Sequence, residues 1–427
     1  MTAPSHARAA LALVLALFLG AACSDSGKGG ETPTAVETAA APKAAATKGG
    51  DAAPLEAGRR ELIEIAFRAA TKLPLVPHVK DRARAQEKVV DTCLALDRED
   101  LALGFAKGIP NWRRGAALAA VALHRARRGE TEGLESLLES AEKVAQENLA
   151  DPDGQPWRSD RIRASIARAL LLAGERARAA KIAATVGESE AGGIQADRIG
   201  ELDDDAFKGE LETLDTIFKS GSFDSVRSAL EACVALHDRF YGRAERRAVL
   251  EERVKTSFTK LPLDLRIGFV CDLAENAIEH GEPAEGKRLA ADATAVFETG
   301  NWHVEDHLEW IARFALLRHR SGETDAALTQ ARDGLAFYDS QYRSIVDIDR
   351  ADALRALAES LHRMGDDETA ARAYAKALEA GIQNPNSRPR ADDLVATCLS
   401  MARWGFTPDD AMRDRIRAIE AELGTPW

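Results

Sequence analysis

The sequence contains an internal duplication, and this feature constrains its fold more than any other. Three short segments recur in the same order: 71–75 as 259–263 (TKLPL), 111–112 as 301–302 (NW), and 129–131 as 322–324 (GET). The offsets between the copies are 188, 190 and 193 residues. A nearly constant offset is expected of a duplicated block that has gained small insertions. We therefore predict two tandem modules of a repetitive array, residues 55–240 and residues 241–427.

The N-terminus resembles a bacterial lipoprotein signal. Residues 9–19 form an apolar stretch that is too short to cross a bilayer. Residues 19–23, Leu-Gly-Ala-Ala-Cys, resemble the lipobox, although Gly20 stands where that family usually has leucine. The resemblance implies removal of residues 1–22 and acylation of Cys23 with a lipid such as palmitate. Ser24 after the cysteine favours the outer membrane, facing the periplasm, and plain secretion is the alternative.

The segment after the signal has the composition of a tether. From residue 24 to residue 54 the chain is almost entirely Ala, Thr, Gly, Lys, Glu, Ser, Asp and Pro, and Val36 is its only larger aliphatic residue. Such a segment cannot bury enough apolar surface to offset the entropy lost on ordering. We predict that residues 23–54 are a disordered tether with a reach of about 30 Å.

The charge and the aromatic content argue against nucleic acid as a partner. The net charge is −12 and aromatic residues make up 5% of the chain. An acidic protein gains little from contacts with phosphates. Few aromatic residues are available as stacking platforms for single-stranded bases.

After residue 54 the apolar residues follow a helical period, and small or polar residues mark the turns. Ala, Leu, Arg and Glu dominate, and alternating strand patterns are rare. Eight expected turn positions divide the region into eight helical hairpins: Asp97, Gly129, Gly174, Gly221, Gly281, Gly322, Gly365 and Gly405. We predict an all-α solenoid in which each module opens with one additional helix.

Residues 351–381 form the most regular copy. The expected core positions are Leu354, Leu357, Ala358 and Leu361 in the first helix and Ala370, Tyr374, Ala377 and Leu378 in the second. With the turn at Gly365, this segment resembles a tetratricopeptide repeat. It departs from that family at Leu354, where an aromatic residue is usual, and at Ile382, where proline is usual. The resemblance implies stacked helix pairs whose inner surface binds a partner.

Two Trp–Arg pairs stand seventeen residues before their turn glycines and suggest a repeated surface in the first module. The candidate partner-binding residues are Trp112, Arg113, Arg125, Trp157, Arg158, Arg161 and Arg168. Aromatic residues can anchor a bound peptide, and arginines can attract an acidic one. The alternatives are that the tryptophans wedge neighbouring hairpins together and that the arginines form a solvated helix face.

The cysteines and histidines are weaker candidates for functional sites than the Trp–Arg pairs. Cys93, Cys233, Cys271 and Cys398 follow the apolar pattern and are expected to pack as small hydrophobic residues, with a Cys233–Cys271 bridge as the alternative. His303 and His307 have a spacing that can hold a metal ion, but no third ligand is evident, and an exposed helix start is the alternative. We therefore assign no metal and no cofactor.

The sequence favours a binding protein over an enzyme. No nucleophile elbow, phosphate-binding loop or dinucleotide fingerprint is present. The leading hypothesis is a membrane-tethered scaffold that binds an envelope protein or peptide through the inner surface of its helical array. The alternatives are an all-α hydrolase acting on envelope polysaccharide through paired carboxylates, and a purely structural lipoprotein.

Overall fold

A computed structural model of the protein describes residues 55–200 and 203–427, and these residues are helical with no strand. The predicted all-α repeat fold is therefore confirmed. The predicted signal peptide, Cys23 and the tether lie outside the described residues. None of the helices in the described ranges combines the length and the apolar character needed to cross a bilayer.

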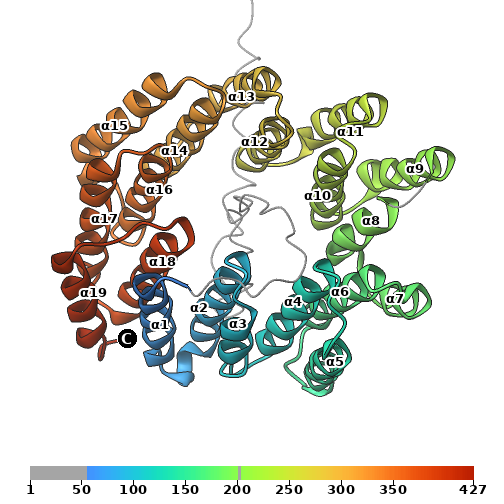
Figure 1. Cartoon of the computed structure of the whole chain (residues 1–427), viewed down its shortest axis with the longest axis horizontal. Helices are drawn as coiled ribbons and strands as arrows, with labels where there is room; N and C mark the ends of the chain where they lie inside the picture. The colour runs from blue at the N-terminus through green and yellow to red at the C-terminus, as the bar shows by residue number, and fades with distance from the viewer. Residues whose placement is uncertain (1–54, 201–202) are drawn as a thin grey trace, which may run out of the picture. The chain divides into compact units, whose positions relative to one another are not determined.

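The helices alternate between an inner and an outer layer (Figure 1). The inner helices are α2 (Leu75–Ala95), α4 (Arg113–Arg127), α6 (Pro156–Leu172), α8 (Gly192–Ile199), α10 (Phe223–Arg239), α12 (Leu263–Glu279), α14 (Val304–Arg320), α16 (Arg350–Arg363) and α18 (Ser387–Trp404). The outer helices are α1 (Ala57–Lys72), α3 (Glu99–Ala106), α5 (Leu134–Ala150), α7 (Arg176–Ala183), α9 (Asp204–Ser220), α11 (Ala244–Ser257), α13 (Pro283–Phe297), α15 (Thr324–Gln341), α17 (Asp367–Ile382) and α19 (Asp410–Glu422). Short 3₁₀ helices occupy Glu188–Glu190, Phe258–Lys260 and Tyr342–Ser344.

Tight turns lead from most inner helices into the next outer helix. Seven of the predicted turn residues have a positive φ, from 55° at Asp97 to 94° at Gly322. The left-handed backbone at these positions favours glycine, because glycine lacks the Cβ that would clash. Gly221 is the exception, since its φ is −69° and it lies between α9 and α10. The prediction of a hairpin turn there was wrong: α10 packs more extensively against α8 and α11 than against α9.

The tetratricopeptide-like segment forms the hairpin that the sequence predicted. Helices α16 and α17 pack closely, and their turn residue Gly365 has a φ of 87°. All eight expected core positions of this segment are buried: Leu354, Leu357, Ala358, Leu361, Ala370, Tyr374, Ala377 and Leu378. The buried hydroxyl groups of Tyr374 and Ser400 lie 2.7 Å apart, which links this hairpin to α18.

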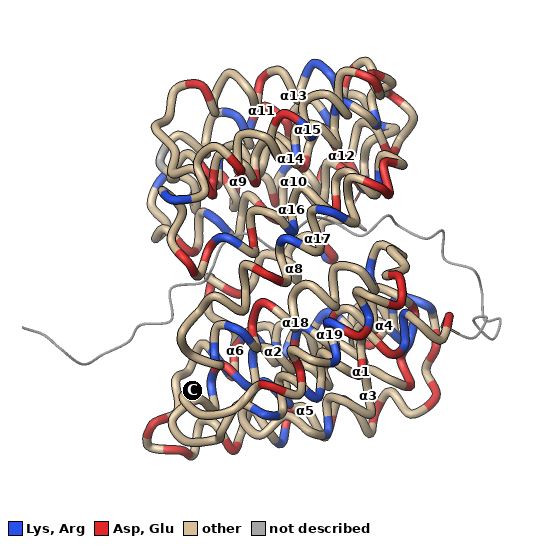
Figure 2. Tube along the Cα trace, turned by 90° about the vertical axis from the view of Figure 1, so that its left-hand side faces the viewer, with Lys and Arg blue, Asp and Glu red and all other residues tan. Residues whose placement is uncertain are grey.

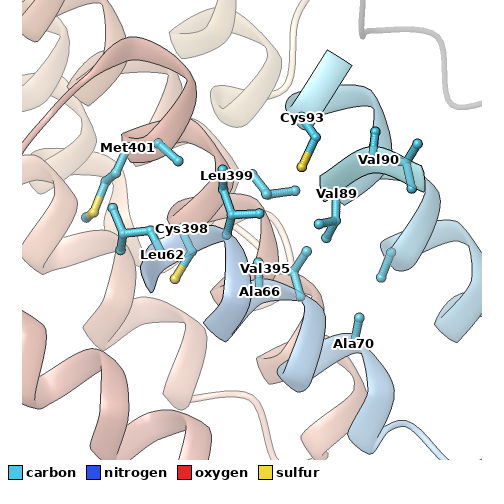
Figure 3. Close-up of a cluster of buried hydrophobic side chains, with 14 of the residues drawn as sticks. Leu62, Ala66, Ala70, Val89, Val90, Cys93, Val395, Cys398, Leu399 and Met401 are labelled. Atoms are coloured by element: carbon cyan, nitrogen blue, oxygen red, sulfur yellow. The ribbon is translucent and has the colours of Figure 1, made fainter. Parts of the chain in front are cut away.

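The helical array closes on itself because α1 packs against α18 (Figures 1 and 3). Leu62, Ala66 and Ala70 of α1 meet an apolar face of α18 that includes Cys398 (Figure 3). These apolar contacts form the closing seam. Burial of each large aliphatic side chain in it contributes about 1.5–3 kcal/mol.

In this seam α1 occupies the outer position of the last hairpin, where the sequence predicted α19. Arg59 of α1 donates from Nε to the carbonyl of Ala402 at 2.8 Å, so α1 begins beside the end of α18. Helix α19 packs less extensively on α18 and lies against α1 and α17. Arg68 makes two hydrogen bonds to the Glu420 carboxylate, at 2.7 and 2.9 Å, which attach α19 to α1. The first and last helices are therefore neighbours.

The two predicted modules are not separated by a gap in the core. The boundary at 240/241 falls between α10 and α11, which pack on each other. One hydrophobic cluster includes residues from both ends of the described chain, among them Leu62 and Ile416. Lys, Arg, Asp and Glu are interspersed along the helices (Figure 2). The duplication is visible in sequence, whereas the packing continues across it.

Candidate functional site

The two tryptophans of the predicted surface pack on each other. Trp112 caps the start of α4 and Trp157 lies in the first turn of α6. Their rings are 5.2 Å apart with an interplanar angle of 80°, an edge-to-face contact. Trp112 is only 7% exposed. This geometry joins two adjacent hairpins, as the wedging alternative proposed.

Three of the predicted arginines surround this tryptophan pair. The guanidinium carbons of Arg113, Arg158 and Arg161 lie 4.8, 5.9 and 5.7 Å from the centre of the Trp112 ring. Glu87 of α2 is buried and accepts hydrogen bonds from Arg113 and, at 3.0 Å, from Arg161. The carboxylate offsets part of the positive charge. The cluster therefore ties α2, α4 and α6 together.

Arg125 and Arg168 lie away from this cluster. Arg125 is in the last turn of α4 and pairs with Glu99 of α3. Arg168 donates from Nε to Asp197 of α8 at 2.6 Å. The seven predicted residues thus do not form one surface: five gather at the tryptophans, and two make separate ion pairs.

His307, Cys233 and Cys271 are packed among other side chains. In the described part of the chain, His, Cys, Asp and Glu side chains form no group of three that could hold a metal ion. The His307 ring packs between Phe297 and Phe337, and burial lowers its pKa. Cys233 and Cys271 are buried free thiols whose pKa burial raises to about 12. The expected packing role of these cysteines is confirmed, and the bridge between them is absent.

The inner helices carry several carboxyl groups with raised pKa values, which the sequence reading missed. Burial, and after it the nearby Asp352 carboxylate, raises the pKa of Glu309 on α14 to about 7. Burial likewise raises the pKa of Asp393 on α18 to about 8. Arg355 forms an ion pair with Asp352 at 2.6 Å. The helical spacing of acidic residues in these helices was the available signal, but abundant Asp and Glu concealed it.

Most of the large apolar side chains that are exposed in the described residues lie on one rim of the helical array. The tight turns all lie at the ends of the inner helices, so the connections back from outer to inner helices share the opposite rim. We call these the turn rim and the connection rim. Six exposed residues belong to the connection rim: Leu75, Val76, Leu149, Phe223, Val346 and Ile348. Val76 is 85% exposed, and Val346 and Ile348 are 57% and 52% exposed.

A groove of about 660 Å³ runs along α14 and α15. Ile311 and Arg318 of α14 line it, together with one face of α15 that includes Asp325, Asp333 and Phe337. Most of its lining residues belong to the outer helix α15, and all of them are distant in sequence from every residue of the predicted surface. No sequence motif indicated this groove, because its lining residues are of common types that come together only when α14 and α15 pack.

Comparison with known proteins gives little further guidance. No family model matches the chain, and no curated protein matches it. Among solved structures, the chain is similar to a circular tandem repeat protein with novel repeat topology and enhanced subunit contact surfaces. The two share 15% sequence identity over 86% of this chain and 96% of the other, with a TM-score of 0.24. A likeness at that TM-score carries no argument, so the fold stands on the helix packing described above.

Proposed function

We propose that this protein is a lipid-anchored, tetratricopeptide-like scaffold that binds another protein or peptide of the bacterial cell envelope and performs no catalysis. The anchor would be an acylated Cys23 in the outer membrane, and residues 23–54 would be the tether in the periplasm. The single observation that supports binding is the set of exposed apolar side chains on the connection rim. Six of the eight large apolar side chains that are exposed in the described residues lie on this rim, and exposed apolar surface can mark a protein interaction site. We therefore place the partner on the connection rim instead of the inner surface of the array.

Site-specific photo-cross-linking in cells tests the binding proposal. A photoreactive amino acid replaces Val76 or Ile348 on the connection rim, and exposed Thr131 or Thr407 on the turn rim as controls. We expect discrete adducts with an envelope protein from the first pair and none from the second. Equal adducts from both rims, or no adduct from Val76 and Ile348, would contradict the proposal.

The lipid anchor has a separate test. Cys23→Ser removes the sulfur that would be acylated and leaves the described helices unchanged. We expect labelled palmitate to be incorporated into the natural chain and absent from the variant, which would leave the membrane fraction. Membrane association that persists in Cys23→Ser would refute the anchor without bearing on the connection rim.

A hydrolase of envelope polysaccharide is the second candidate, and the inner carboxyl groups favour it. Glu309 has a pKa near 7 and Asp352 is ion-paired with Arg355, which are the properties of an acid and a carboxylate in a glycosidase. Release of reducing sugar from purified cell-wall polysaccharide would support this candidate if Glu309→Gln abolishes it. Equal release of reducing sugar by the natural chain and by Glu309→Gln would rule out Glu309 and Asp352 as the catalytic pair.

A further inference from the structure

The groove on α14 and α15 combines an apolar floor with carboxylates that form no ion pair with any described residue. Asp325 and Asp333 are exposed on α15. Within the described residues, neither carboxylate forms an ion pair or a side-chain hydrogen bond. Elsewhere on the same helix Asp339 pairs with Lys376 of α17 at 2.5 Å. Two negative charges therefore remain available at the groove.

The lining residues of α15 are in register along one helical face. Asp325, Thr329, Asp333 and Phe337 are spaced four residues apart, so they form one line along the helix. With a rise of 1.5 Å per residue, the two carboxylates are about 12 Å apart along the axis and the Phe337 ring is about 6 Å further on. The groove thus offers two acidic positions followed by an aromatic one.

The apolar part of the groove is held in place by packing. Phe337 is 37% exposed, and its ring is 5.5 Å from that of His307, which in turn contacts Phe297. At Gly334 a Cβ would come within 3.0 Å of Ile311, so α15 lies close against the floor. At the other end Arg318 is engaged by Glu323 at 3.4 Å and by Gln330 at 3.2 Å. The floor and the aromatic end are therefore preformed.

We propose that this groove binds a cationic amphipathic helix of a partner protein. The helix would place two Lys or Arg side chains, about two turns apart, against Asp325 and Asp333, and an apolar side chain one turn further against Phe337 and Ile311. Helices commonly dock in grooves through such spaced anchors. The carboxylates disfavour nucleic acid and other anionic partners. The proposal rests on the proposed function in taking the protein to be a partner-binding scaffold, and it adds a second surface and the chemistry of what binds there.

A designed probe peptide tests the groove directly. The probe is a labelled helical peptide of about 18 residues, rich in Ala and Gln, with two Lys residues eight positions apart and Leu four positions further. Fluorescence anisotropy measures its binding to the full-length protein in detergent. We expect saturable binding that weakens as salt is raised. The double substitution Asp325→Asn and Asp333→Asn is expected to weaken it about fivefold, as for two exposed ion pairs.

Matched variants separate the groove from general charge effects. Asp339→Asn removes a carboxylate from another face of α15 and is expected to leave binding unchanged. Phe337→Ala is expected to weaken binding independently of salt, because it removes apolar contact. A control peptide with Glu in place of Lys is expected not to bind.

Three results would overturn the proposal: no binding of the Lys peptide at any accessible concentration, equal binding to the natural chain and the double variant, or equal binding of the Lys and Glu peptides. The last result would indicate a purely apolar occupant. The cross-links from Val76 and Ile348 report on the connection rim alone. Peptide binding without those cross-links would refute the proposed function and leave the groove proposal standing. Cross-links without peptide binding would refute the groove proposal and leave the proposed function standing.

Discussion

At the scale of single residues, Asp393 shows how burial on an inner helix changes acid–base behaviour. Its side chain is 7% exposed and accepts a hydrogen bond from Asn384 Nδ2 at 3.1 Å. Its pKa is raised to about 8, mainly by loss of water around the carboxyl group and then by the Asp352 carboxylate, with Arg355 acting in the opposite direction. The folded protein therefore binds this proton more tightly than the unfolded chain does, whose aspartates have a pKa near 3.9.

This shift predicts a pH dependence of stability. Because the folded-state pKa is raised, the stabilising contribution is complete below about pH 4 and is lost as pH rises through about 8. Asp393→Asn keeps an acceptor for Asn384 and removes the titration. We expect the free energy of unfolding, measured in urea at pH 5 and pH 9, to fall less with pH in the variant, by about 1–3 kcal/mol.

Asp325→Asn is the matched control for this measurement, since Asp325 is exposed in the groove on α15. The free energy of unfolding of Asp325→Asn is expected to vary with pH as that of the natural chain does. An unchanged profile for Asp393→Asn would show that the Asp393 carboxyl group is ionised at neutral pH in the folded protein.

At the scale of helices, small residues decide how closely neighbours approach. Gly115 is buried on α4, and a Cβ there would lie 2.8 Å from Ile162 Cδ1 of α6 and 2.8 Å from Val144 Cβ of α5. Gly209 of α9 is also helical but exposed, and a Cβ there would meet no atom within 4 Å. The same residue type thus has opposite roles in two helices.

Alanine substitutions at these glycines are expected to have opposite signs. Gly115→Ala should lower the free energy of unfolding by about 1–3 kcal/mol, because α4 must move away from two neighbours. Gly209→Ala should raise it by about 0.5–1 kcal/mol, because alanine favours the helix. Chemical denaturation of both variants checks the pair. Equal effects would mean that helix propensity, and not the approach of α5 and α6, controls both positions.

At the scale of the whole molecule, the seam between α1 and α18 connects the two ends of the described chain. Open helical arrays propagate stability only to neighbouring repeats. Here α1 is a neighbour of both α2 and α18. Destabilising α1 should therefore also destabilise α18, which is more than 300 residues away in sequence.

Hydrogen exchange on a seam variant tests this coupling. Leu62 is 2% exposed on α1, and Leu62→Ala is expected to cost about 2–5 kcal/mol and to speed amide exchange in both α1 and α18. Leu214→Ala, at an equally buried position of α9, should speed exchange around α9 and α10 and leave α18 protected. If Leu62→Ala leaves the amides of α18 unaffected, the seam does not couple the two ends.

The local pattern was informative wherever a structure depends on residues close in sequence. The hairpin of α16 and α17 was predicted position by position, because apolar spacing and a turn glycine specify a pair of adjacent helices. The candidate surface was predicted less well. The sequence located Trp112 and Trp157 at equivalent helix starts, but it did not reveal Glu87, whose carboxylate comes from a different hairpin.

The sequence by itself determined that this protein is helical, repetitive and turned at left-handed residues, since these properties follow from periodicity and from the conformational freedom of glycine. Only the tertiary structure decided that α1 completes the last hairpin in place of α19, that apolar side chains share the connection rim, and that Asp325 and Asp333 form no ion pair within the described part of the chain. The physical reason is that side-chain burial and charge pairing are set by helices distant in sequence. Periodicity shows which face of a helix is apolar but does not show which helix will cover it.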